Sequence, residues 1–227
     1  MTFRSLKLED IRVDTFFEIT RNRKLIPSRR ALQVDMESRL QALKAGGIIH
    51  LGDLVRTLDS EKKREDFSRK HGLPPEYLTL LVREAKSYLP RPFPLEKFPG
   101  VPFEYAEILR SRGIRNTREA YEAFRSPEER DRWGRTCGIP RARMDELQAL
   151  CDLSRITGVG PVFARISYLA GIRSCAEFAH TPLQEMHERF LQVLDKVSFP
   201  TGNFSRDDLE YCRIYADLIA KREGMEK

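Results

Sequence analysis

The sequence predicts an all-α fold, and three observations support this prediction. Between Leu153 and Leu169 the apolar residues recur at three- and four-residue steps, which is the spacing of a buried helical stripe. Helix-start patterns recur along the chain: in Ser126-Pro127-Glu128-Glu129 a capping serine precedes a first-turn proline and two acidic residues near the positive helix end. No stretch combines sustained two-residue alternation with β-branched residues, as strands would.

Composition and charge indicate which broad class the protein belongs to and which partners are compatible with it. Hydrophobic residues make up 41% and charged residues 33% of the 227 residues, which indicates a soluble globular chain. No run approaches the roughly 18 apolar residues of a membrane span, and the charged N-terminus lacks a secretory signal, so we expect a cytoplasmic protein without a membrane partner. A formal charge of +6 is compatible with a nucleic-acid partner without establishing one.

The cysteines and histidines are too scattered for a zinc site, so we expect reduced structural thiols, no bound metal and no cofactor. The residues concerned are Cys137, Cys151, Cys175, Cys212, His50, His71, His180 and His187.

The stretch 153–172 predicts two helices joined by a short hairpin. Gly158 and Gly160 allow a tight turn with a bare backbone, which a residue with a Cβ would resist. Pro161 suits the first turn of the second helix, where its missing N–H would have no intrahelical partner. Gly171 stands where that helix should end.

The pattern apolar-x-x-apolar-x-Gly-Val-Gly-Pro-x-x-Ala resembles the helix-hairpin-helix motif of many DNA repair and replication proteins. With Phe163 before Ala164, and Gly171-Ile172 following, the chain is most similar to a bacterial and archaeal family of tandem helix-hairpin-helix domains of unknown function. The resemblance implies that hairpin amides contact a backbone phosphate, and free N–H groups at a helix start do form an anion site. Because that family has no assigned role, the resemblance implies no pathway.

The motif recurs, which predicts tandem helical repeats that stack to share a core. A shift of 58 residues places Gly158-Val159 on Gly100-Val101 and Gly171-Ile172 on Gly113-Ile114. A further shift of 66 residues places Gly113-Ile114 on Gly47-Ile48, but no hairpin glycine remains in that copy. We therefore expect four segments: a basic N-terminal segment (1–29), a degenerate unit (30–90), a second unit (91–152), and a third unit with a C-terminal helix (153–227).

Two segments lie outside the repeats. Leu89 to Gly100 contains four prolines and cannot be helical, so it is the best candidate for a domain boundary. The first thirty residues match no repeat, and they form either an extra helix from Leu8 to about Arg21 or a partly mobile basic arm. From Arg21 to Lys44 there are seven basic residues against two acidic ones, which favours a phosphate-tracking surface there.

The predicted phosphate contacts are the two hairpins and the cations near them. The third unit's hairpin has a second glycine, whereas the second unit's hairpin has a proline and one amide fewer. The candidate residues are Gly158, Val159, Gly160, Arg155, Arg165, Gly100, Val101, Lys97, Arg110, Arg29 and Arg30.

Two functions remain open at this stage. The first is a non-catalytic protein that binds nucleic acid through backbone phosphates, with DNA favoured over RNA. The second is a protein–protein interaction scaffold with purely structural hairpins, favoured by apolar Val162 and Phe163 where DNA-binding versions commonly carry a cation. An enzyme is not expected, because the first aspartate beyond Gly160 is Asp195 and no nucleotide-binding loop, metal cluster or catalytic triad is visible. No small-molecule substrate is evident either.

Overall fold

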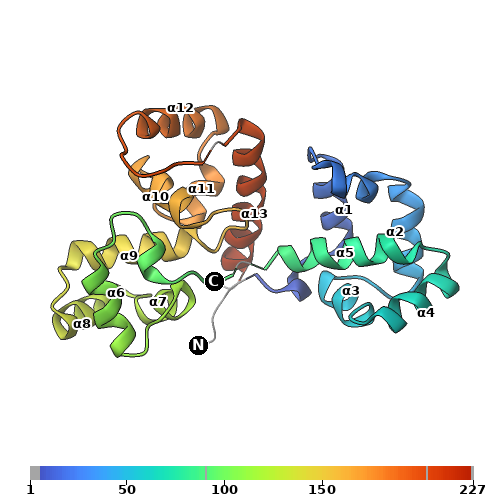
Figure 1. Ribbon diagram of the computed structural model, residues 1–227, viewed down its shortest axis with the longest axis horizontal. Coiled ribbons are helices and arrows are strands. Elements are labelled where there is room, and N and C mark those ends of the chain that lie inside the picture. The colour runs from blue at the N-terminus through green and yellow to red at the C-terminus, as the bar shows by residue number, and fades with distance from the viewer. Residues whose placement is uncertain (1–5, 90, 203, 226–227) are drawn as a thin grey trace. The chain divides into compact units, whose positions relative to one another are not determined.

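The computed structural model describes residues 6–89, 91–202 and 204–225. This part of the chain contains helices and no β-strand, which confirms the all-α prediction. The extended pairing found there is an isolated antiparallel bridge between Arg12 and His50. The chain divides into two compact units, Leu6–Leu89 and the described residues that follow (Figure 1).

The first unit incorporates the N-terminal segment into its core. The expected helix from Leu8 to Arg21 is interrupted, because Val13 N–H donates to the Ile49 carbonyl (2.8 Å) and Leu51 N–H donates to the Ile11 carbonyl (2.9 Å). These bonds attach residues 11–13 to the start of α3 (Leu51–Thr57), and Phe16 on the following helix is fully buried. Its elements are a 3-10 helix Leu8–Asp10, α1 Val13–Arg21, a 3-10 helix Pro27–Gln33, α2 Met36–Ala45, α3 Leu51–Thr57, α4 Glu61–His71 and α5 Pro75–Ser87.

The second unit contains two consecutive groups of four α-helices. The proline-rich segment before them forms no α-helix over its described residues 91–100. It is held on α7 (Thr117–Ala123) because Phe93 N–H donates to Thr117 Oγ1 (3.1 Å) and Thr117 N–H donates to the Phe93 carbonyl (2.9 Å). Its elements are a 3-10 helix Leu95–Lys97, α6 Phe103–Ser111, α7 Thr117–Ala123, α8 Pro127–Cys137, α9 Arg141–Leu153, α10 Pro161–Leu169, α11 Cys175–His180, α12 Leu183–Leu194 and α13 Arg206–Met225.

Helix bounds recur at the two offsets seen in the sequence. Helix α6 spans 103–111 and α10 spans 161–169, so both bounds are 58 residues apart. Helices α4 and α5 begin at 61 and 75, and α8 and α9 begin 66 residues later, at 127 and 141. The glycines that follow α2, α6 and α10 (Gly47, Gly113 and Gly171) are all left-handed, with φ of 80°, 92° and 83°. A shared pattern of helix ends therefore underlies both units.

Each helical group of the second unit has its own core. In α6–α9 the buried cluster includes Leu109, Phe124 and Met144, with Trp133 packed edge-on against Phe124 at 5.9 Å between ring centroids. In the group α10–α13 the core contains the rings of Phe163, Phe178, Phe190 and Phe204, whose neighbouring ring centroids lie 5.4 to 6.4 Å apart. Among the described residues, none of the helices combines the length and apolar character that a membrane crossing requires.

Candidate phosphate-binding hairpins

The two hairpins share a left-handed glycine and the hydrogen bond that closes the turn. Gly100 precedes α6 and Gly158 precedes α10, with left-handed φ of 78° and 94° that favour glycine. In each hairpin the valine amide closes the turn: Val101 N–H donates to the Phe98 carbonyl (3.1 Å), and Val159 N–H donates to the Ile156 carbonyl (3.0 Å). The expectation that these two valine amides face a ligand is therefore wrong.

Other amides at both hairpins remain open. The residues that cap α6 and α10, Pro102 and Gly160, supply no side-chain acceptor. Within the described residues no hydrogen bond engages the first-turn N–H groups of Phe103 in α6 or Val162 in α10, nor the N–H of either hairpin's left-handed glycine. Such N–H groups at the positive end of a helix are suited to an anionic oxygen.

The Gly158 hairpin is covered in part by the protein itself. A Cβ placed on Gly158 would lie 3.0 Å from the Cys212 sulfur and 3.5 Å from the Tyr211 ring, both on α13. On the other side, a Cβ on Gly160 would lie 4.0 Å from the Phe93 ring. Gly158 itself remains exposed, whereas Val159 is buried and Gly160 is half-buried, so these neighbours cover only part of the hairpin.

Arg155 is a buried structural cross-link, and its predicted role as a phosphate ligand near the Gly158 hairpin is wrong. Its side chain is 4% exposed. It donates to Tyr121 Oη (2.6 Å) and Asp152 Oδ1 (2.5 Å) through Nη1, and to Glu223 Oε1 (2.6 Å) through Nη2. Its guanidinium also lies 4.4 Å from the Tyr121 ring centroid. The residue thereby joins α7, the end of α9 and α13.

Arg165 lies beside the other hairpin, which corrects the prediction that it flanks Gly158. It starts on α10, but its guanidinium carbon lies 3.5 Å from the position of a Cβ on Gly100. Its Nη2 is 2.6 Å from Glu146 Oε1, an ion pair without hydrogen-bond geometry, and its Nε has no hydrogen-bond partner among the described residues. The residue is only 5% exposed, so a buried donor is left open next to the hairpin.

Two further arginines extend this cluster. Arg143 on α9 donates to Glu146 Oε2 (2.6 Å) while its side chain remains 47% exposed. The guanidinium carbons of Arg165 and Arg173 lie 5.6 and 5.5 Å from the Tyr168 ring centroid. We call the set Gly100, Arg143, Glu146, Arg165, Tyr168 and Arg173 the Gly100 site. It carries three arginines against one glutamate. Glu146, Tyr168 and Arg173 are not among the predicted site residues, because Glu146 meets Arg165 only through the packing of α9 against α10, and Tyr168 and Arg173 join the site through their contacts with Arg165 and with each other.

The other predicted cations of the second unit are more exposed. Lys97 is exposed on the 3-10 helix that precedes the Gly100 hairpin. Arg110 is also exposed, but it forms ion pairs of 2.5 Å with both Glu96 and Glu107. Two carboxylates therefore balance the charge of Arg110, whereas Lys97 keeps an exposed ammonium near the hairpin.

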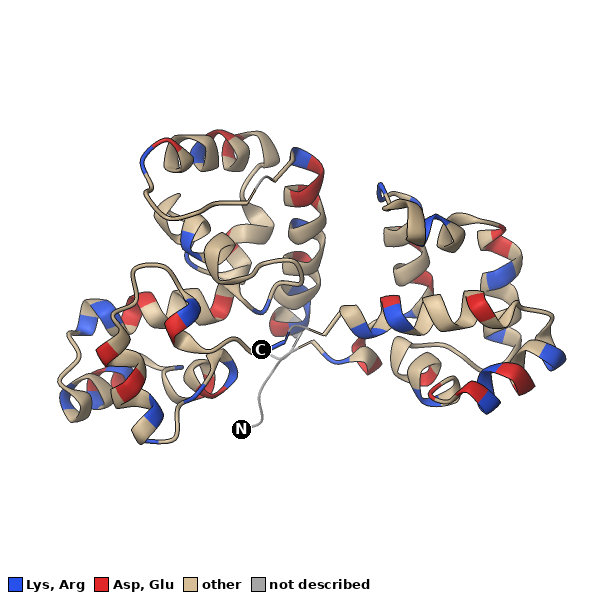
Figure 2. Ribbon diagram, viewed as in Figure 1, with Lys and Arg blue, Asp and Glu red and all other residues tan. Residues whose placement is uncertain are grey.

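The basic N-terminal region is largely neutralised, contrary to its predicted role as a phosphate-tracking surface. Arg29 and Arg23 both bond to the buried carboxylate of Glu84, at 2.5 and 2.8 Å, and Glu84 lies 61 residues beyond Arg23. Arg30 is exposed, and no ion pair to it occurs among the described residues. Figure 2 shows acidic and basic residues interleaved along the helices of each unit. The further pairs are Arg21–Glu37, Arg39–Asp35 and Lys44–Asp14.

Comparison with known proteins supports a domain without assigned function. A family model described as "Domain of unknown function (DUF4332)" matches residues 99–198. The matched range begins just before Gly100 and includes both hairpins and every residue of the Gly100 site. Searches of curated proteins and of solved structures found no match to the chain.

Proposed function

We propose that this protein is a non-catalytic, cytoplasmic nucleic-acid-binding protein built from tandem helix-hairpin-helix units, with the Gly100 site as its main phosphate contact. The recurrence of helix bounds at 58 and 66 residues supports the tandem units. The Gly158 hairpin, which is richer in glycine, serves mainly as a packing contact with Tyr211 and Cys212 of α13. DNA is the favoured ligand over RNA because the resemblance is to DNA repair and replication proteins.

The open Nε of Arg165 is the observation that carries this proposal. A buried donor without an acceptor costs about 1–3 kcal/mol, and more when it belongs to a charged group. A phosphate oxygen at the Gly100 hairpin would accept from this donor and from the open amides of α6 together. Arg143 and Arg173 then add cations at the rim, where Glu146 balances only one of the three charges.

This arrangement predicts binding without sequence specificity. Backbone amides and arginines that meet phosphate oxygens fix the position of a nucleic acid but read no base edge. Affinity should therefore depend on charge and fall steeply with salt, because each neutralised phosphate releases condensed counterions.

The test is fluorescence anisotropy with a short labelled DNA duplex, titrated at several salt concentrations. The double variant Arg143→Gln/Arg173→Gln should bind more weakly, and the slope of log K against log salt should become shallower by about 1.8 if two phosphate contacts are lost. The matched control Lys62→Gln/Lys70→Gln removes the same charge from exposed positions of the first unit and should leave the slope unchanged.

A protein–protein scaffold is the second candidate, and exposed apolar residues favour it. Phe103, Leu169 and Leu191 are 60%, 47% and 46% exposed, and apolar side chains of this size can contribute to a partner interface. Absence of duplex binding even at low salt would support the scaffold and reject the phosphate contact. Equal losses in both double variants would show that net charge alone drives binding.

A further inference from the structure

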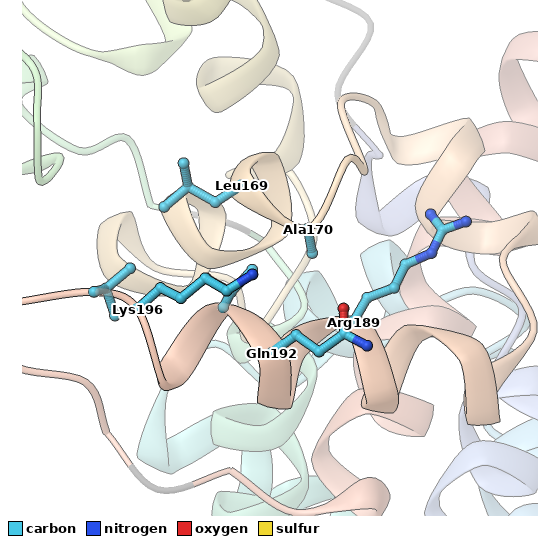
Figure 3. Close-up of a pocket in the computed structure, with 7 residues that line it drawn as sticks. Leu169, Ala170, Arg189, Gln192 and Lys196 are labelled. Carbon is cyan, nitrogen blue, oxygen red and sulfur yellow. The ribbon is translucent and has the colours of Figure 1, made fainter.

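A cavity of about 410 Å³ lies between the end of α10 and α12 (Figure 3). Ligand pockets for small molecules begin at about 300 Å³, so the cavity has the size of a small-molecule site. It is separate from both hairpins and is used by nothing in the proposed nucleic-acid contact. Its lining residues are Leu169, Ala170, Arg189, Gln192, Val193, Lys196 and Val197.

The cavity exists because the α10–α12 interface is filled unevenly. At its other end Phe163 on α10 packs edge-on against Phe190 on α12, with 5.4 Å between ring centroids. Near the C-terminal ends of α10 and α12 the lining residues Ala170, Val193 and Val197 are smaller than these phenylalanines. Leu169 stands at the margin of the gap with 47% of its surface exposed, so the apolar lining is open to a ligand.

One cation faces this lining without an acidic partner. Arg189 and Gln192 lie three residues apart on one face of α12, and Lys196 lies just beyond the last residue of that helix, Leu194. Arg189 already pairs with Glu185. Lys196 has no ion pair or hydrogen bond through its ammonium among the described residues, and Figure 3 shows its side chain running along the space below Ala170.

We propose that this cavity binds a small aliphatic carboxylate. The alkyl chain would cover Leu169, Val193 and Val197, while the carboxylate would meet the ammonium of Lys196. The Gln192 amide, which also lines the cavity, would donate a second hydrogen bond to the carboxylate. The lining combines apolar side chains with one amide and two cations, of which Arg189 is already paired with Glu185, and this set matches an alkyl carboxylate better than a neutral alkane, an alkylamine or a bare phosphate.

The test uses the full chain and octanoate, followed by amide chemical shifts in two-dimensional NMR and by isothermal titration. Octanoate should perturb residues 169–171 and 192–197 and should bind more tightly than butanoate, because each buried methylene contributes about a fourfold gain. Lys196→Gln should weaken octanoate binding by up to about fivefold, the range of an exposed charge pair. Lys221→Gln on α13, an exposed lysine paired with Asp217, is the charge-matched control and should have no effect.

Four results would overturn the proposal. These are absence of octanoate binding, equal binding of octanol, equal or tighter binding of octylammonium, and equal losses in the Lys196 and Lys221 variants. None of them bears on the Gly100 site, so the two proposals stand or fall separately.

Discussion

The hairpins at Gly100 and Gly158 differ in their surroundings although their backbones match. Each has a left-handed glycine, a valine amide that closes the turn and a nine-residue helix behind it. Beside Gly158 lie a thiol and an aromatic ring of α13, and beside Gly100 lies the guanidinium of Arg165. A motif thus determines the turn, while the residues packed against the turn determine whether an anion can reach it.

The residues at equivalent positions before the two hairpins show the same contrast. Lys97 lies 58 residues before Arg155. Lys97 is exposed, whereas Arg155 is enclosed by α7, α9 and α13 and holds Asp152 and Glu223. The same repeat position therefore carries a solvent-exposed lysine before one hairpin and a buried, ion-paired arginine before the other.

The largest expected effect comes from Arg155→Ala compared with Lys97→Ala. Removing Arg155 leaves the mostly buried Asp152 without its cation, and breaking such a pair costs roughly 3–5 kcal/mol in the free energy of unfolding. Lys97→Ala should change that free energy by less than about 0.5 kcal/mol, as exposed substitutions do. Urea denaturation followed by the fluorescence of the single tryptophan, Trp133 in the second unit, measures both. Similar costs for the two variants would contradict the buried role of Arg155.

A smaller effect is expected from alanine at the two hairpin glycines. Both replacements place a Cβ on a left-handed backbone, which costs about 1–2 kcal/mol of stability. Gly158→Ala should cost more than Gly100→Ala, because its Cβ meets the Cys212 sulfur at 3.0 Å whereas the nearest atom at Gly100 is at 3.5 Å. Duplex affinity should show the opposite order, with Gly100→Ala the weaker binder. Fluorescence anisotropy with the folded variants measures this order of affinities. If only Gly158→Ala lost duplex binding, the phosphate contact would lie at the Gly158 hairpin instead of the Gly100 site.

Much of the helical architecture could be predicted from local sequence. The capping box at Ser126 and Glu129 begins α8 at the residues the sequence indicated, and the left-handed Gly138 ends it. The offset of 58 residues matched α6 to α10 because left-handed glycines and helix-start prolines act over a few residues. Such signals are local, so a single sequence is enough to read them.

The placement of charged side chains could not be predicted in the same way. Counting acidic neighbours along the chain left the Arg21–Lys44 region apparently unpaired, yet Glu84 joins Arg23 and Arg29 from a distant helix. Arg155 and Arg165 lie off the apolar stripe of their segment, but neighbouring helices bury both. Ion pairs between helices depend on tertiary packing, which periodicity does not encode.

Phe103 offers a way to sharpen the comparison between the hairpins. It is 60% exposed at the first position of α6, and Pro161 occupies the equivalent position of α10. An aromatic ring next to a phosphate contact can stack on a base, which contributes roughly 1–3 kcal/mol. Phe103→Ala should therefore weaken binding of a single-stranded oligonucleotide by about 1 kcal/mol, the lower end of that range, and leave duplex binding nearly unchanged. Equal losses for both ligands would show that Phe103 supports the hairpin instead of contacting a base.

The smallest effect is expected from Arg110→Gln, a single charge removed near the Gly100 hairpin. Because Glu96 and Glu107 both pair with Arg110 at 2.5 Å, a phosphate would have to displace a carboxylate to reach it. Exposed pairs contribute about 0–1 kcal/mol, so stability should change little. Duplex affinity should also fall less than in Arg143→Gln, where Glu146 is shared with Arg165 and part of the cationic charge remains unbalanced. An equal loss of affinity in the two single variants, measured at one salt concentration, would mean that the Arg110 pairs open on binding and that the phosphate contact extends along α6.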